Sequence, residues 1–387
     1  MRRLLRVLGA VVLALVAVAP AAWAAPGVCA GHEAPSGPPA REEAGPVVAP
    51  VPVPAEPVGG EALGTCGDAV PAGAPPPPPV GATGWVVADL DTGAVLAAHD
   101  PHGRQRPAST LKILTTLVVR ERLDLDSVVV AAPADVQVDG SRAGIVPGGS
   151  YTVRQLLAGL LLNSGNDTAN ALARTLGGVP AALEAMQAKA STLGALDTRP
   201  GSVSGLDGPG MSTSAYDLAV LFRVALRDPT IRELVGTRSV PFPGFGTQSG
   251  FTLSNNDPLL LRYPGAIGGK TGFTDAARHT FVGAAQRNGR RLVVSLVRGE
   301  QRPVRMEKQA EALLDYGFAL PASTAPVGTL VDAAPAPPPA RSASAAFGAA
   351  PGARVNPPGH PGWWWAGSVI IVLAVGAAGA GVLRRRR

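Results

Sequence analysis

The chain has 387 residues and carries 34 lysines and arginines against 28 acidic residues, a formal net charge of +6. Seven of the basic residues are arginines within the first six and the last four positions, so 27 basic residues (34 minus 7) face 28 acidic ones in between. This near-neutral balance gives no electrostatic basis for nucleic-acid binding.

Residues 1–24 have the pattern of a secretory signal peptide. Arginines come first, an apolar run follows over 7–18, and Ala22-Trp23-Ala24 is typical of a cleavage site. A membrane anchor is the alternative, and the shortness of the apolar run disfavours it. The pattern therefore predicts that the rest of the chain is exported.

Residues 25–82 are rich in proline, alanine, valine and glycine, and this composition predicts an extended spacer. Both cysteines, Cys29 and Cys66, lie within it. In an oxidising exterior we favour a disulfide between them, although two free thiols remain the alternative. The histidines are scattered and no CxxC or HExxH spacing occurs, so the sequence predicts no metal site.

A folded domain is predicted to begin at residue 83. Residues 84–89 and 94–98 have the apolar pattern of two strands, joined by a turn over Asp91-Thr92-Gly93. Beyond Pro107, leucines recur at helical spacing, which predicts a buried helix that begins near Ser109.

Ser109 and Lys112 are three residues apart at the start of this predicted helix, so the Lys112 amine can approach the Ser109 hydroxyl. Alone this spacing is weak, because such a pair is usually a cap and a solvated charge. Lysine usage strengthens it, since only four of the 34 basic residues are lysines: Lys112, Lys189, Lys270 and Lys308. Arginine cannot give up its proton, whereas a desolvated lysine can. Lys112 is therefore a candidate base for a serine nucleophile.

Helical periodicity dominates the middle of the chain, and strand patterns return after Pro258. The predicted helices are 152–162, 167–178, 183–193, 215–226 and 302–318. The predicted strands are 266–273, 279–286 and 291–298. Strands at both ends with helices between them predict an α/β fold of the α+β type, in which an antiparallel sheet is flanked by helices and carries an all-helical insertion.

The C-terminal part again changes composition. Residues 321–362 are rich in proline, alanine and serine and predict a stalk. Residues 363–383 are apolar almost throughout, begin with three tryptophans, and are long enough to span a bilayer. The four arginines at 384–387 are expected to stay in the cytoplasm. The chain is thus predicted to be a single-pass membrane protein with its main domain outside the cell.

Three short elements occur in a fixed order along the predicted domain. They are Ser109-Thr110-Leu111-Lys112 at a helix start, Ser164-Gly165-Asn166 in a loop between helices, and Lys270-Thr271-Gly272 on a strand. In this order they resemble the penicillin-recognising serine enzymes. With the runs 204–208 (SGLDG) and 269–277 (GKTGFTDAA), the chain is similar to the low-molecular-mass penicillin-binding proteins that are D-alanyl-D-alanine carboxypeptidases.

This resemblance implies a catalytic domain over residues 83–320 with a β-lactamase/transpeptidase-like fold. Ser109 would be the acylated nucleophile and Lys112 the base that takes its proton. Ser164 would relay a proton to the leaving group, and Asn166 would hold the amide of the substrate.

The remaining residues of the implied site bind substrate. Lys270 and Thr271 would bind its terminal carboxylate, and Gly272 would keep the strand edge clear. Backbone N–H groups of Ser109 and Phe273 would form the oxyanion hole. Arg305, early in the last helix, is either a further contact to the carboxylate or a solvated surface charge.

The implied activity is removal of the terminal D-alanine from peptidoglycan pentapeptide stems through an acyl-enzyme, which needs neither metal nor cofactor. β-Lactams would be acylating inhibitors. The alternatives are a D,D-endopeptidase, a weak β-lactamase, or a wall-binding or drug-sensing module that is acylated without turnover. Gly165 stands where penicillin-hydrolysing relatives often carry Asp, and no ExxLN stretch occurs, so rapid β-lactam hydrolysis is disfavoured.

Overall fold

The computed structural model of the chain describes residues 29, 31–35 and 48–335. Its helices are η2 (Glu61–Gly64), η3 (Ala108–Leu111), α1 (Lys112–Arg122), α2 (Pro133–Val136), α3 (Val153–Leu162), α4 (Asn166–Thr175), α5 (Val179–Thr192), α6 (Ala215–Ala225), α7 (Pro229–Gly236), α8 (Pro258–Arg262) and α9 (Met306–Ala319). Its strands are β1 (Asp68–Ala69), β2 (Gly84–Asp89), β3 (Ala94–His99), β4 (Val128–Val130), β5 (Ser150–Thr152), β6 (Ser239–Phe242), β7 (Phe251–Ser254), β8 (Ala266–Thr274), β9 (Arg278–Arg287), β10 (Arg290–Gly299) and β11 (Gly328–Thr329).

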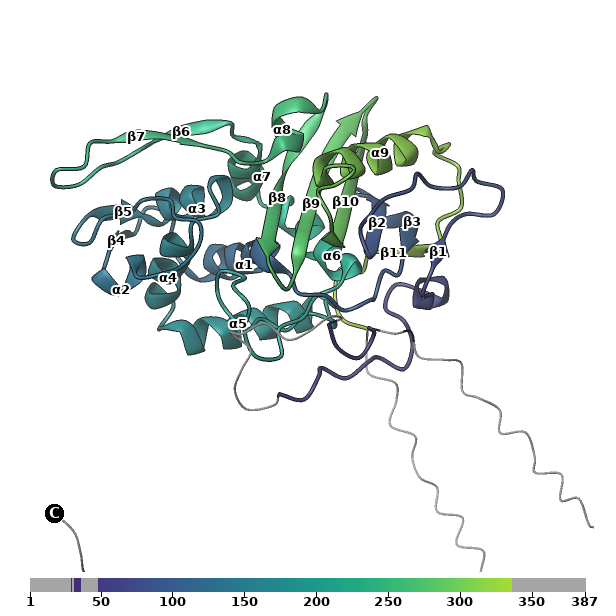
Figure 1. Ribbon diagram of the computed structural model, residues 1–387, viewed down its shortest axis with the longest axis horizontal. Coiled ribbons are helices and arrows are strands. Elements are labelled where there is room, and N and C mark those ends of the chain that lie inside the picture. Colours follow the sequence, from purple (N-terminus) through teal and green to yellow (C-terminus); the bar gives the residue numbers. More distant parts are fainter. Residues whose placement is uncertain (1–28, 30, 36–47, 336–387) are drawn as a thin grey trace, which may run out of the picture. The chain divides into compact units, whose positions relative to one another are not determined.

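A seven-stranded antiparallel sheet lies at the centre of the described chain (Figure 1). Its order is β1-β3-β2-β10-β9-β8, with β11 also paired to β3. The early strand β2 pairs with the late strand β10, with Val87 opposite Val294. The predicted fold class, an antiparallel sheet with helices between its first and last strands, is therefore confirmed, and β8 is left at one edge.

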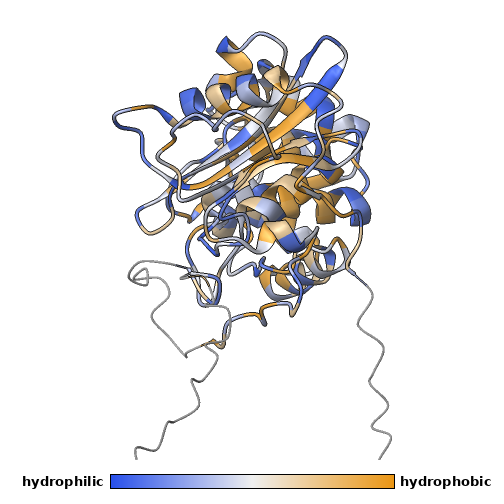
Figure 2. Cartoon of the chain, turned by 90° about the vertical axis from the view of Figure 1, so that its right-hand side faces the viewer, coloured by the Kyte–Doolittle hydropathy of each residue, from blue (hydrophilic) through white to orange (hydrophobic). Residues whose placement is uncertain are grey.

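The sheet is buried on both faces because its inner strands are apolar at successive positions. Val86 and Val293 face one hydrophobic cluster, which continues into α1, α3 and α6. Their neighbours Val87 and Val294 face the other, which is closed by Leu313 and other residues of α9. Figure 2 shows the hydrophobic colouring concentrated along the strands and the helices packed against them. The sheet thus supplies a rigid support for groups placed at its β8 edge.

The helical part contains the predicted helices, with shifted boundaries. α3 begins after the capping box formed by Thr152 and Gln155, as the pattern indicated. α5 begins at Val179, earlier than predicted, because Pro180 in the first turn and the preceding Gly178 start a helix there. α9 begins at Met306 and not at 302. The short hairpins β4–β5 and β6–β7 and the helix α7 were not predicted.

The extended spacer predicted over 25–82 is wrong for the described residues 48–82. β1 pairs with β3 through Asp68 opposite His99, and the side chains of Val58 and Leu63 are buried in the core. Cys29 and Cys66 form a disulfide, with 5.4 Å between their Cα atoms, as favoured from the sequence. Composition suggested a spacer, but the segment packs on the domain.

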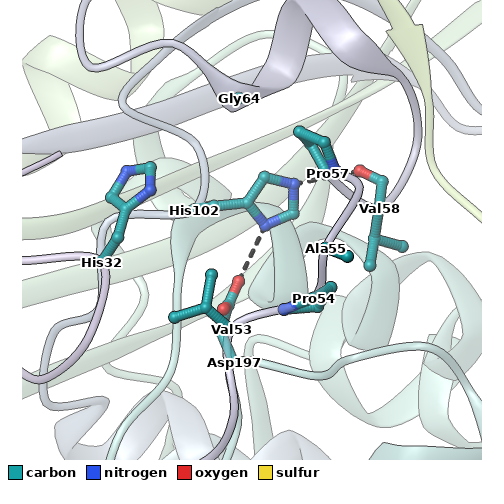
Figure 3. Close-up of a pocket in the computed structure, with 9 residues that line it drawn as sticks. All are labelled: His32, Val53, Pro54, Ala55, Pro57, Val58, Gly64, His102 and Asp197. Carbon is teal, nitrogen blue, oxygen red and sulfur yellow. Dashed lines mark hydrogen bonds and ion pairs between the residues drawn. The ribbon is translucent and has the colours of Figure 1, made fainter. Parts of the chain in front are cut away.

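Buried basic side chains explain why this proline-rich segment packs. A proline lacks an N–H group but keeps its carbonyl, so such a segment offers acceptors to the domain. The Arg104 guanidinium donates to the carbonyls of Glu33, Val51 and Pro52. The His102 ring lies against the same segment, with Nε2 3.0 Å from the Val58 carbonyl (Figure 3).

The stalk predicted over 321–362 also packs where it is described. β11 pairs with β3, and Leu330 is only 1% exposed. Over the described residues, no helix has both the length and the apolar character needed to cross a bilayer. The signal peptide predicted at 1–24, the span predicted at 363–383 and the tail at 384–387 lie outside the described residues.

Candidate active site

Ser109 lies in the 3-10 turn η3, directly before α1 and against the edge strand β8. The turn is fixed from two sides, because the hydroxyls of Thr110 and Thr280 both donate to the Pro107 carbonyl, at 2.6 and 2.7 Å. Ala108, just before the serine, has a φ of +47°, a strained conformation for a residue with a side chain. The surrounding contacts thus hold the serine in a tight turn.

Lys112 is fully buried, and its amine meets three oxygen atoms. Nζ lies 2.9 Å from Ser109 Oγ, 2.7 Å from Asn166 Oδ1 and 2.5 Å from the Ser204 carbonyl. Burial, and after it the positive charge of Lys270, hold the pKa of Lys112 well below its usual range, while the Asp167 carboxylate opposes this. The predicted approach of the amine to the serine is confirmed.

The hydrogen-bond partners decide where the lone pair of a neutral Lys112 points. Asn166 Nδ2 donates to the Asp139 carbonyl, so its Oδ1 can only accept from Lys112, as can the Ser204 carbonyl. These two acceptors take both N–H groups of a neutral amine. The lone pair then faces Ser109 Oγ, which is the only one of the three partners able to donate a proton.

The β8 strand brings Lys270, Thr271 and Gly272 beside the serine. A side chain at position 272 would place its Cβ 2.8 Å from the Ser109 backbone nitrogen, so glycine permits this close approach. Because β8 is an edge strand, the side of it that faces η3 pairs with no other strand. Phe273 follows on the same strand, with its side chain half exposed. The edge strand next to a helix start agrees with the predicted position of an oxyanion hole.

Lys270 is the second buried amine. Its Nζ donates to the Thr271 carbonyl at 2.8 Å. Burial lowers the pKa of Lys270 to about 8, against the raising effect of the Asp257 carboxyl. At neutral pH Lys270 is therefore mostly a cation, whereas at Lys112 burial and the nearby Lys270 charge both lower the pKa and so favour the free amine.

Ser164 and Asn166 lie where α3 ends and α4 begins. Ser164 is 8% exposed and has a φ of +59°, a second strained position, two residues before Asn166. Asn166 joins the site directly through Lys112. Three separate segments, η3 with α1, the α3–α4 loop and β8, thus meet around Ser109.

The structure places Arg305 and His279 outside this set of contacts. The Arg305 side chain is 71% exposed, and its guanidinium lies 4.0 Å from the Glu307 carboxylate, which agrees with the solvated alternative. The His279 ring packs against Phe273 at a tilt, with 4.5 Å between the ring centroids, and lies near Gln301.

Several contributors to the site were not found from the sequence. Thr280 fixes the turn before the serine, and the Asp139 carbonyl orients Asn166. The Ser204 carbonyl lies in a run that had been noted only as part of the resemblance. A backbone carbonyl carries no signal of residue type, so the sequence could not have assigned these roles to Asp139 or Ser204.

A cluster of His102, Asp197 and Asp217 has the residue types of a metal site, but His102 and Asp197 are already paired with protein groups. The two ring nitrogens of His102 lie 2.8 Å from Asp197 and 3.0 Å from the Val58 carbonyl (Figure 3). Arg104 donates to the other oxygen of Asp197. The second such group contains Cys29, which is in the disulfide. Neither group has a free set of ligands for a metal.

Comparison with known proteins gives consistent results. Residues 72–301 match the family described as D-alanyl-D-alanine carboxypeptidase. The chain is 51% identical over 258 residues to D-alanyl-D-alanine carboxypeptidase DacB2 of Mycobacterium tuberculosis, covering 65% of this chain and 88% of that protein. It is 35% identical to DacD of Salmonella typhimurium, covering 63% of this chain and 64% of that one.

Solved structures are similar too. A D-alanyl-D-alanine carboxypeptidase of Mycobacterium tuberculosis has 49% identity and a TM-score of 0.65, covering 68% of this chain and all of that one. The Streptomyces K15 DD-transpeptidase has 32% identity and a TM-score of 0.60, covering 64% of this chain and all of that one.

Proposed function

The chain belongs to the D-alanyl-D-alanine carboxypeptidase family, and we propose that it removes the terminal D-alanine from peptidoglycan pentapeptide stems through an acyl-enzyme on Ser109. The observation that carries this proposal is the position of the buried Lys112 amine, 2.9 Å from Ser109 Oγ. Its N–H groups are committed to Asn166 and Ser204, so its lone pair faces the hydroxyl.

Acylation begins when Lys112 Nζ takes the Ser109 hydroxyl proton. The freed Oγ attacks the carbonyl carbon of the penultimate D-alanine, and the N–H groups of Ser109 and Phe273 stabilise the negative oxygen that forms. The peptide C–N bond then breaks. Its nitrogen receives a proton through Ser164, and the terminal D-alanine leaves. Attack of water on the ester releases the shortened stem and regenerates the serine.

The other residues of the site bind substrate in this proposal. Lys270, as a cation, and the Thr271 hydroxyl bind the terminal carboxylate, and this predicts a preference for stems that end in a free D-alanine. Asn166 is directed by Asp139 and Lys112 and holds the substrate amide at the edge of the cleft. Gly272 allows the serine and the strand to come close enough for one carbonyl to lie between them.

The experiment is D-alanine release by the purified full-length chain from a synthetic pentapeptide stem that ends in D-Ala-D-Ala. The parent protein is expected to release D-alanine steadily and to gain the mass of one penicillin molecule on treatment. Ser109→Ala is expected to lose both properties. A variant without the Ser109 hydroxyl that keeps full activity would contradict the assignment, and a penicillin adduct without D-alanine release would favour a non-turnover module.

The location of the enzyme is a further part of the proposal. The sequence pattern of residues 1–24 and the apolar run over 363–383 support export and tethering by one C-terminal helix, with the catalytic domain outside the cell membrane. Membrane fractionation of the full chain and of a chain ending at residue 335 tests this. The full chain is expected in the membrane fraction and the shortened chain in the soluble fraction.

A further inference from the structure

Asp167 follows the Ser164-Gly165-Asn166 element and is almost fully buried, at 1% exposure. Its carboxylate accepts the backbone N–H groups of Ala143 and Gly144, both at 2.8 Å, and of Ile145 at 3.2 Å. One of its oxygens also accepts the N–H of Thr168 at the start of α4. A single charged side chain thus fixes three successive residues of the loop over 139–146 against α4.

This 139–146 loop returns to the active site through Asn166. The Asn166 backbone N–H donates to the Ser141 carbonyl at 2.8 Å, and its Nδ2 donates to the Asp139 carbonyl at 2.7 Å. The second contact fixes the orientation of the amide, so Oδ1 is turned toward Lys112. Gly140 lies between Asp139 and Ser141 in the loop, and a Cβ at this position would be 3.0 Å from Asn166 Nδ2.

The β6–β7 hairpin supports the loop from its other side. Gln248 Nε2 donates to the Gly144 carbonyl at 3.2 Å, and the Phe251 ring would lie 3.3 Å from a Cβ at Gly144. Figure 1 shows this hairpin extending from α7 alongside α3. The loop therefore has Asp167 on one side and the hairpin on the other, and its position depends on both.

Building on the proposed function, we propose that Asp167 is a positioning residue for acylation. Its carboxylate holds the 139–146 loop, the Asp139 carbonyl of that loop orients the Asn166 amide, and Asn166 Oδ1 keeps the Lys112 amine directed at Ser109. Asp167 itself touches neither the serine nor the amine in the contacts described, so it acts through Asn166 and not on the reacting atoms.

Because Asp167 is charged, its replacement should change the pH dependence of activity, which the loss of a purely structural contact would not do. The charged groups that act on Lys112 are Lys270 of β8, which lowers its pKa, and Asp167 of α4, which raises it. Removal of the Asp167 charge therefore lowers the pKa of Lys112 further. The acid limb of the activity profile, where Lys112 loses its proton, then moves to lower pH while the maximum rate falls.

The test compares Asp167→Asn with Asp228→Asn in the full chain. Asp228 is a matched control because its carboxylate also accepts two backbone N–H groups, of Thr230 and Ile231 at the start of α7. It pairs in addition with Arg120, at the opposite end of α1 from Lys112. The measurements are the acylation rate with a fluorescent penicillin, kcat and KM for D-alanine release across pH, and hydrogen–deuterium exchange of the amides at 143–145.

For Asp167→Asn we expect acylation to slow by roughly 10- to 100-fold, mainly through kcat, because small displacements of catalytic groups have effects of this size. The acid limb should move to lower pH and the amides at 143–145 should exchange faster. Asp228→Asn should change none of these. Unchanged acylation by Asp167→Asn, with or without faster exchange, overturns the proposal.

A second variant keeps the test decisive if Asp167→Asn does not fold. Gly140→Ala presses on Asn166 from the loop while retaining the Asp167 charge, so it should slow acylation and leave the acid limb in place. Normal acylation by Gly140→Ala would overturn the proposal. If the parent protein does not release D-alanine, the proposed function is contradicted. The role of Asp167 is still tested in that case, because penicillin acylation and amide exchange do not depend on D-alanine release.

Discussion

Arg104 and Lys112 are both fully buried and lie on either side of Pro107, but the protein pairs them differently. Arg104 donates to the Asp197 carboxylate and to carbonyls of the N-terminal segment. Although burial works against it, the hydrogen bond from His102 and the charge of Arg104 hold the pKa of Asp197 below its usual range. Arg104 and Asp197 therefore keep their charges, and they fasten one part of the chain to another.

Lys112 has no carboxylate among its hydrogen-bond partners in the described structure, only a hydroxyl, an amide oxygen and a carbonyl. A second cation, Lys270, lowers its pKa further. The comparison teaches that burial alone does not make a base. Arg104, paired with a carboxylate, stays charged and contributes to structure, whereas burial among neutral acceptors and next to a second cation lowers the pKa of Lys112.

The largest effect on activity is expected when Lys112 is replaced by arginine, because the buried cation of the active site then keeps its charge as Arg104 does. Lys112→Arg retains a positive side chain that cannot give up its proton, so acylation by a penicillin should slow by roughly 10³-fold. Stopped-flow or gel-based acylation rates measure this. Lys189→Arg is the control, because Lys189 pairs with Glu121 away from the site. This variant should be acylated at the rate of the parent protein. Rapid acylation by Lys112→Arg would show that another group is the base.

The reverse experiment breaks the paired cluster. Arg104→Met leaves Asp197 without its guanidinium and the N-terminal segment without a donor, so the free energy of unfolding should fall by about 3 kcal/mol. Urea unfolding measures the loss. The acylation rate of the folded variant should stay close to that of the parent, since Arg104 acts on the segment and not on Ser109. A large loss of activity at full stability would contradict this division.

The two buried lysines are expected to give the pH profile two limbs. The rate constant kcat/KM should rise as Lys112 loses its proton and should fall again near pH 8, as Lys270 loses the charge that binds the substrate carboxylate. Bound substrate stabilises the Lys270 cation, so the alkaline limb of kcat should lie at higher pH. A flat kcat/KM profile between pH 7 and 10 would show that the Lys270 charge does not bind the substrate carboxylate.

The smallest effect is expected at Asp257, the carboxyl that acts on Lys270. Burial raises the pKa of Asp257 to about 6, so its ionisation disfavours the folded state above that pH and has no such effect below about pH 3.8. Asp257→Asn should therefore be more stable than the parent above pH 6. It should also move the alkaline limb of kcat/KM to lower pH, by less than about one unit. Thermal unfolding at pH 4 and 8 checks the first result.

Much of the fold follows from local pattern. The strands β2, β3, β8, β9 and β10 lie within one or two residues of their predicted bounds. For the inner strands the reason is that a strand buried on both faces reads as a continuous apolar run. The boundaries of α5 and α9 were less well predicted, and the β6–β7 hairpin was not predicted at all. These segments depend on contacts with distant residues, as in the contact of Gln248 with Gly144.

The proline-rich segment shows where composition misleads. Proline content predicts an extended chain unless something else supplies hydrogen-bond donors, and here Arg104 and His102 supply them. Neither residue is marked in the sequence as a partner of residues 33–58. Only the folded chain brings the donors and the carbonyls together.

The sequence by itself determined which groups could do the chemistry. A chain that uses arginine for nearly every positive charge, and places lysine one turn after a serine, identifies the removable proton without any structure, because that property belongs to the side chain. The tertiary structure decided whether the proton is removed, because a pKa depends on burial and neighbouring charge. The folded chain brought Lys270, Asn166 and the Ser204 carbonyl from distant parts of the sequence close to one amine, and it placed the Asp139 carbonyl where it orients Asn166.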